Sequence, residues 1–185
     1  AITDTNKILS FNIAKNPTVS SLHRFSRNLD KYWPGYREPH CTYVKKIKVK
    51  GITLEKYCIK NKIEKISYIH IDTQGNDLKV LKGLKKKIKI IEKGVLEAAV
   101  NKKISLYQNT HTVNEVQKFL KKNNFNISKI VSAEKNISNE KNIFFYNKSI
   151  NSKNLIKTKY NLAHFERIIS KSTHFLDYLI NKVEK

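Results

Sequence analysis

The chain of 185 residues is poor in glycine and cysteine, and each scarcity excludes a class of site. Its five glycines lie well apart, so no Gly-rich loop of the G-x-G type is present to let a cofactor approach the backbone closely. The two cysteines, Cys41 and Cys58, lack the paired spacing of a zinc site or a disulfide framework. A reduced, cytoplasmic setting is therefore expected.

Long apolar runs are also absent. No stretch approaches the about 20 residues that span a bilayer, so no membrane partner is expected. The chain has no methionine, not even an initiator, and it opens directly on a short apolar strand pattern. Its 39% hydrophobic content is enough for the core of one domain of this length.

Acidic residues are scarce, and the net charge is +22. Only four of the 37 basic residues are arginine, the residue that proteins use most for bidentate contacts to bases. Lysine, asparagine and isoleucine are all abundant and share A/T-rich codons. The lysine runs at 45–50 and 85–87 are therefore expected to be solvated faces, and nucleic acid is not the expected partner. A Lys-driven binder of nucleic acid or acidic glycan stays an alternative.

Hydrophobic periodicity predicts an α/β chain. Strands are predicted at residues 8–13, 44–49, 66–71 and 95–99, with an antiparallel pair at 127–131 and 142–146. The strands at 66–71 and 95–99 are predicted to be parallel neighbours, joined by a helix at 76–87 in a right-handed crossover. Helices are predicted at residues 54–62 with Thr53 as cap, at 76–87, at 113–124 behind a Thr112–Glu115 capping box, and at 162–183. Residues 16–43 have no clear period and form a long excursion, which in a compact domain is functional or disordered.

The segment at residues 66–84, ISYIHIDTQGNDLKVLKGL, is the most informative. An apolar run ends in Asp72, passes a sharp turn at Gly75 and continues as an amphipathic stretch. This pattern predicts a buried strand, a tight turn and a helix packed on the strand. Because ligands in open α/β sheets bind at the carboxyl ends of strands, Asp72 is predicted to lie at the edge of an active site.

This segment resembles the strand-four motif of the FkbM-family methyltransferases, where Ile-Asp, then Glu-Gly or Gln-Gly, precedes a helix with Leu-Lys-Gly. The resemblance extends over residues 1–147 in the order of the family: AITD at 1–4 and Ser20–Leu22, VKKIKVKGITLEKY at 44–57, GVLEA at 94–98, and the stretches 113–125 and 142–145. It implies a Rossmann-like class I methyltransferase fold with a partial sheet, an antiparallel closing strand pair and a C-terminal helix. Residues 148–185 are expected to be a linker and that amphipathic helix.

The resemblance implies S-adenosylmethionine-dependent methylation of a hydroxyl on a sugar or another small acceptor. The family binds its cofactor on a Gly-rich loop after the first strand, and this chain has no such loop. We therefore expect residues 1–147 to be the C-terminal part of such a domain, with weak or no binding of S-adenosylmethionine by the chain alone. A catalytically inactive remnant that acts as a scaffold or binds a partner chain is a further alternative. Without a first strand, the strand at 66–71 would expose an edge that invites pairing.

The resemblance also indicates catalytic and cofactor-binding residues. Asp72 and Glu97 are the predicted catalytic carboxylates, and Asp4 and Ser21 are predicted to bind the cofactor. A carboxylate at Asp72 can orient the acceptor, assist its deprotonation or hold a divalent metal, and the need for a metal is left undetermined. Alternatively, Asp72 only caps the turn, in which case backbone amides around residues 74–77 should donate to it.

Gln74, Trp33 and Tyr36 are the predicted substrate-binding residues. Gln74 and Gly75 are also expected to form the turn, with Gly75 at positive φ. The aromatic pair can line an acceptor pocket or simply pack its loop on the core. If Asp72 serves chemistry, its carboxylate should face an open cleft near Glu97 or near this aromatic loop.

Overall fold

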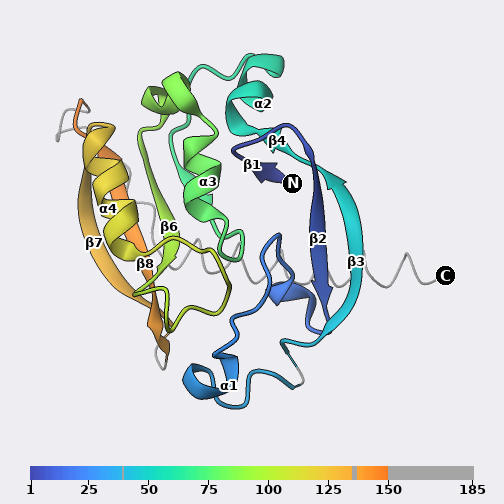
Figure 1. The fold of residues 1–185 in the computed structure, drawn as a ribbon. Helices are drawn as coiled ribbons and strands as arrows, with labels where there is room; N and C mark the ends of the chain where they lie inside the picture. The colour runs from blue at the N-terminus through green and yellow to red at the C-terminus, as the bar shows by residue number, and fades with distance from the viewer. Residues whose placement is uncertain (39, 135–136, 150–185) are drawn as a thin grey trace. The chain divides into compact units, whose positions relative to one another are not determined.

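A four-stranded mixed sheet in the order β5-β6-β8-β7 underlies the candidate site (Figure 1). The strands are β5 (Ile69–Ile71), β6 (Lys93–Ala99), β7 (Phe125–Glu134) and β8 (Ile137–Asn147). β5 and β6 are parallel and β7 and β8 are antiparallel, as the sequence predicted, and the structure adds that β8 lies antiparallel to β6. The predicted strand at 66–71 is too long, because Ile66 makes only an isolated bridge to Ile91.

The computed structural model describes residues 1–38, 40–134 and 137–149, which belong to one unit, Ala1–Ser149. The predicted helix at 162–183 lies outside the described residues. None of the helices in the described ranges is long and apolar enough to cross a membrane. The structure confirms a mixed α/β fold, while the Rossmann-like class I architecture stays a prediction.

Two further sheets have two strands each. β1 (Ile2–Thr3) pairs in parallel with β4 (Ile52–Thr53). β2 (Ile8–Ala14) pairs antiparallel with β3 (Tyr43–Lys50), which confirms both predicted strands. The lysines of β3 are exposed, as expected of a solvated lysine run.

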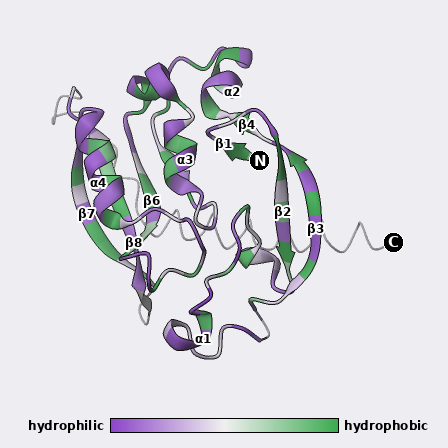
Figure 2. Ribbon diagram, viewed as in Figure 1, coloured by the Kyte–Doolittle hydropathy of each residue, from purple (hydrophilic) through white to green (hydrophobic). Residues whose placement is uncertain are grey.

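Two helices of the described chain begin at caps that follow from local sequence. α2 (Leu54–Lys60) is capped by Thr53, whose hydroxyl accepts a hydrogen bond from the Lys56 amide at 3.2 Å. α4 (Val113–Lys122) begins with the predicted capping box between Thr112 and Glu115. Figure 2 shows hydrophobic and hydrophilic residues on both α3 (Asp77–Lys82) and α4, as expected of helices with one face on a core.

The main core lies between these helices and the four-stranded sheet. It combines buried apolar side chains of α3, α4 and all four strands: Leu78, Leu81, Val116, Leu120, Ile71, Leu96, Phe125, Ile143 and Phe145. This packing explains the apolar stripes in the sequence, because each helix turns one face toward the sheet.

The predicted helix at 76–87 is wrong in length. α3 ends at Lys82, and a 3₁₀ helix, η2 (Lys85–Ile90), begins at Lys85, which has a positive φ of 48°. The helix end is crowded by β1, because a Cβ on Gly83 would lie 2.4 Å from the carbonyl oxygen of Thr3. Packing against β1 therefore requires glycine at residue 83, and the positive φ of Lys85 interrupts the α-helical backbone.

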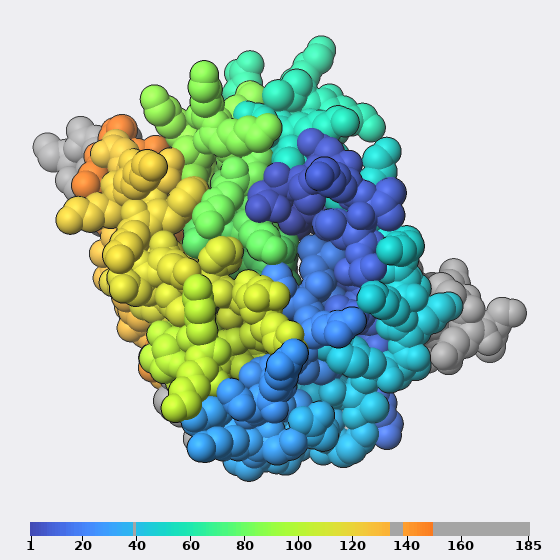
Figure 3. Space-filling model, in the orientation of Figure 1, coloured from blue at the N-terminus to red at the C-terminus, as the bar shows by residue number. Residues whose placement is uncertain are grey.

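The described residues of the long excursion at 16–43 pack on the rest of the fold. It contains η1 (Pro17–Val19) and α1 (Leu29–Tyr32) and packs against the segment that follows β6 (Figure 3). Backbone hydrogen bonds join the two segments, from the Ser26 amide to the Leu106 carbonyl and from the Gln108 amide to the Arg24 carbonyl, both at 2.8 Å. A second hydrophobic cluster forms between them: Ala14, Phe25, Leu29, Trp33, Cys41, Leu106 and Tyr107.

Candidate functional site

The turn between β5 and α3 presents Asp72 directly after the carboxyl end of its strand. Gln74 has a φ of 52° and Gly75 a φ of 88°, so both predicted turn residues adopt the left-handed conformation. Gly75 also needs to be small, because a Cβ there would lie 2.7 Å from Cγ2 of Thr110 and 3.2 Å from Cδ2 of Tyr107. The turn is therefore pressed against the segment that follows β6.

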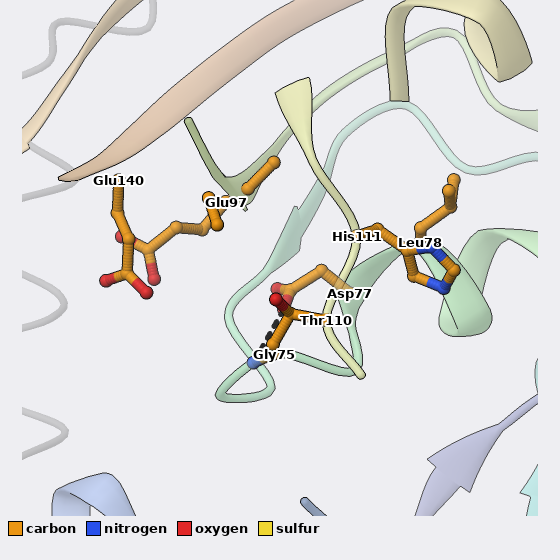
Figure 4. A pocket seen from close by; sticks show the side chains of 9 residues that line it. Gly75, Asp77, Leu78, Glu97, Thr110, His111 and Glu140 are labelled. Atoms are coloured by element: carbon orange, nitrogen blue, oxygen red, sulfur yellow. Dashed lines mark hydrogen bonds between the residues drawn. The ribbon is translucent and has the colours of Figure 1, made fainter. Parts of the chain in front are cut away.

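Asp77, not Asp72, caps this turn. Its Oδ1 accepts a hydrogen bond from the Thr73 amide at 3.1 Å, and its Oδ2 accepts one from the Gly75 amide at 3.2 Å (Figure 4). Burial raises the pKa of Asp77 to about 7, against the lowering effect of these backbone donors. The capping alternative for Asp72 is therefore wrong, and the Asp72 carboxylate instead accepts a hydrogen bond from Nε2 of Gln74 at 2.8 Å.

A cavity of about 250 Å³ opens beside Asp72. Because Ile71 and Leu96 are register partners, Asp72 and Glu97 follow them at equivalent positions of neighbouring parallel strands. Five of the seven predicted site residues line this cavity: Asp72, Gln74, Glu97, Trp33 and Tyr36. The structure thus brings together the predicted catalytic and substrate-binding residues.

The aromatic wall of the cavity is fixed by the core beneath it. The rings of Trp33 and Tyr36 meet edge to face with centroids 5.2 Å apart. Trp33 is buried, and its indole Nε1 donates a hydrogen bond to the carbonyl of Ile104 at 2.8 Å. Trp33 therefore lines the cavity and packs the loop at the same time, so the two alternatives for this residue are compatible.

A second, water-sized pocket of about 10 Å³ adjoins Asp77 (Figure 4). Glu97 and Glu140 line both this pocket and the larger cavity. Sequence analysis missed Glu140, which lies on β8 opposite Ala99 and belongs to no motif. It also missed Tyr107, although the segment after the carboxyl end of β6 is where the strand-end rule places ligand-binding residues.

The two predicted cofactor residues lie outside the cavity lining. Asp4 is exposed just after β1, and its carboxylate accepts a hydrogen bond from the hydroxyl of Thr3 at 3.2 Å. Ser21 is buried, and its hydroxyl donates to the backbone carbonyl of Gln74 at 2.6 Å. Ser21 thus stabilises the turn through the backbone of Gln74. The cofactor roles of Asp4 and Ser21 stay predictions.

Polar atoms beside β1 fit a polar nucleoside cofactor. The side-chain amide of Asn76 donates to the carbonyl of Ile2 at 3.1 Å, and the same side chain interacts with the imidazole of His23. His23 lies near Asn76 and Lys79, and burial followed by the Lys79 charge lowers its pKa to about 4. The buried imidazole of His23, the amide of Asn76 and the exposed carboxylate of Asp4 are of the types that bind the hydroxyl and amine groups of such a cofactor. Within the described ranges, no group of three or more His, Cys, Asp or Glu side chains is placed to hold a metal ion.

Comparison with known proteins gives one match. Residues 10–127, more than half of the chain, match the model of the family described as the methyltransferase FkbM domain. No curated protein and no solved structure matches the chain significantly. The matched region contains the turn and most of the residues that line the cavity. The comparison therefore favours a methyltransferase over the scaffold and binding alternatives. The chain belongs to the FkbM methyltransferase domain family.

Proposed function

We propose that the chain contributes the acceptor site of an enzyme that transfers a methyl group from S-adenosylmethionine to a hydroxyl group of a small molecule, such as a sugar, bound in the 250 Å³ cavity. The observation that carries the proposal is the convergence of Asp72, Gln74 and Glu97 with an aromatic wall at the carboxyl end of a parallel strand. Ligands in open α/β sheets bind at this edge. The cavity is at the small end of ligand sites, which supports a small acceptor.

Asp72 would act on the acceptor hydroxyl. Its carboxylate follows β5 directly and lines the cavity, where it can accept the hydroxyl proton as the oxygen becomes the nucleophile. Gln74 donates a hydrogen bond to Oδ1 of Asp72, so Oδ2 is the oxygen that would bind the hydroxyl of the methyl acceptor. When bound, S-adenosylmethionine supplies a methyl group on a positively charged sulfur.

The wall made by Trp33 and Tyr36 would orient the acceptor. Aromatic faces pack well against the C–H groups of a sugar ring, while the carboxylates opposite them bind its hydroxyls. Asp4 and Asn76 would hold the cofactor on the β1 side of the turn. Ser21 would contribute through the turn, because its hydroxyl already binds the carbonyl of Gln74.

Substitution of Asp72 tests the proposal. Asp72→Asn keeps the shape and removes the charge, so methyl transfer should fall about 100-fold or more, the usual scale for an acid–base group. The measurement is transfer of label from methyl-labelled S-adenosylmethionine to a panel of monosaccharides and glycosides by the full-length protein. The melting temperature should barely change, because Asp77 holds the turn.

A matched control is Asp30→Asn, which removes an exposed carboxylate that pairs with Arg37 at 2.6 Å and does not line the cavity. This variant should keep full transfer. Full activity in Asp72→Asn together with a lowered melting temperature would make Asp72 structural and would reject the proposed role.

A further inference from the structure

Tyr107 connects the second hydrophobic cluster to the candidate site. Its ring is buried and stacks on Phe25 with centroids 5.4 Å apart. Its hydroxyl oxygen lies 2.8 Å from Oε1 of Gln74 and 2.8 Å from the carbonyl oxygen of Val19. The hydroxyl has one proton, which the two acceptors share in a three-centre hydrogen bond, with Tyr107 as the donor to Gln74.

Two contacts together fix the orientation of the side-chain amide of Gln74, one with Tyr107 and one with Asp72. With its oxygen facing the hydroxyl of Tyr107, the amide turns its nitrogen toward Asp72 and donates to Oδ1 at 2.8 Å. The reverse orientation would place an amide oxygen against a carboxylate oxygen, which is repulsive. The backbone of Gln74 is fixed as well, because Ser21 donates to its carbonyl at 2.6 Å.

Tyr107 is suited to remain a donor. Burial, followed by the charges of Glu140, Cys41, Asp72 and Glu97, raises the pKa of its hydroxyl far above the ordinary value. The hydroxyl therefore stays protonated at any pH at which the protein works. A residue that orients another through a hydrogen bond needs this constancy, because a lost proton would reverse the direction of the bond.

We propose that Tyr107 is a positioning residue, which holds the Asp72 carboxylate at the acceptor hydroxyl by fixing the amide of Gln74, and this role rests on the function proposed for Asp72. The chain of contacts runs from Tyr107 to Gln74 to Asp72, and each link is 2.8 Å long. Loss of one hydrogen bond at the far end should leave Asp72 present but misplaced. Small misplacements of reacting groups lower turnover steeply.

The first test measures the amide itself and needs no substrate. In ¹⁵N-labelled protein, the side-chain NH₂ signal of Gln74, assigned from its loss in Gln74→Met, should show one downfield proton with slowed solvent exchange. Tyr107→Phe should move this proton toward the position of a free amide and speed its exchange about 10-fold, since one bonded orientation is no longer enforced.

Tyr43→Phe is the matched control. Tyr43 stacks on the other side of the same cluster, with its ring centroid 4.7 Å from that of Phe25, and its hydroxyl accepts from the Phe25 amide. Removing this hydroxyl perturbs the cluster without touching Gln74, so the Gln74 signal should stay in place. Equal shifts in both variants, or no shift in Tyr107→Phe, would overturn the positioning role.

The second test is a double-mutant cycle on methyl transfer. Tyr107→Phe should lower kcat about 10-fold with little change in the KM of the acceptor, and in an Asp72→Asn background it should lower kcat no further. Independent, additive losses would contradict action through Asp72. If the buried variant does not fold, Gln74→Met replaces it at a half-buried position and should give the same loss.

The two tests separate the two proposals. A displaced Gln74 signal in a protein that transfers no methyl group to any hydroxyl acceptor would reject the proposed function and keep the contact that orients Asp72. An unmoved signal in a protein that does transfer methyl groups would reject the role of Tyr107 and keep the function.

Discussion

Asp77 buries a carboxyl group beneath the turn that carries Asp72, and this links stability to pH. Burial raises its pKa from 3.8 to about 7, so the folded protein binds a proton that the unfolded chain has released in this range. The free energy of unfolding contributed by Asp77 is therefore full below about pH 4 and is lost as the pH rises through about 7. The opposite direction would hold for an ion-paired carboxylate.

The free energy of unfolding of the natural protein should depend on pH differently from that of Asp77→Asn. Asp77→Asn cannot release this proton, so the stability advantage of the natural protein over the variant should be larger at about pH 5 than at about pH 8. The measurement is urea unfolding at both values. His23 titrates in the other sense, because burial lowers its pKa from 6.5 to about 4. Since the variant keeps His23, the subtraction removes its contribution, and a difference that grows with pH would contradict the assignment.

At the scale of the element, the turn between β5 and α3 is held by packing as well as by its backbone. Gly75 and Gly35 both have positive φ, 88° and 78°, but only Gly75 is crowded. Gly35→Ala should cost about 1 kcal/mol, because alanine resists the left-handed conformation. Gly75→Ala should cost a further ~1–3 kcal/mol, because its Cβ would lie 2.7 Å from Cγ2 of Thr110.

Chemical denaturation of the two alanine variants measures this difference directly. Gly35 serves as the matched control, since no atom lies within 4 Å of a Cβ built there. The crowding also involves the ring of Tyr107, 3.2 Å from the same Cβ, so Gly75→Ala should shift the Gln74 amide signal too. Equal losses of stability in the two variants would show that the backbone conformation alone explains the need for glycine at residue 75.

At the scale of the whole molecule, like charges dominate. With a net charge of +22, mutual repulsion should lower stability at low salt, and screening should raise it. We expect the melting temperature to rise by several degrees between about 20 mM and about 300 mM NaCl, where the Debye length falls below the spacing of many charge pairs. Lys46→Gln and Lys48→Gln together, both on exposed positions of β3, should reduce this rise.

Scanning calorimetry in NaCl, KCl and sodium acetate at equal ionic strength measures the effect and tests for specific binding of the cation or of the anion. A melting temperature that falls with salt would instead mean that ion pairs such as Lys85–Glu55, at 3.2 Å, outweigh the repulsion.

The sequence also predicted pairing with another chain through an exposed sheet edge. β5 is an end strand of the four-stranded sheet within the described ranges, and sedimentation velocity would reveal association of chains.

Local sequence determined much of the fold on its own. The strands β5 to β8 and the capping box of α4 were predicted, because each depends on periodicity or on residues three or four positions apart. The parallel pairing of β5 with β6 was predicted from the right-handed rule for a strand, helix and strand in sequence. The position of Asp72 after its strand and the positive φ of Gly75 follow from the same kind of signal.

Only the tertiary structure decided which side chains serve the turn and the cavity. Asp77 rather than Asp72 caps the turn, because its buried carboxylate accepts hydrogen bonds from two backbone amides. No local sequence pattern distinguishes these two aspartates, which are five residues apart. Tyr107 reaches Gln74 across 33 positions of the chain, and Ser21 reaches it across 53. Contacts of that range arise when strands and loops pack together, so their partners are set by the whole fold and not by neighbouring residues.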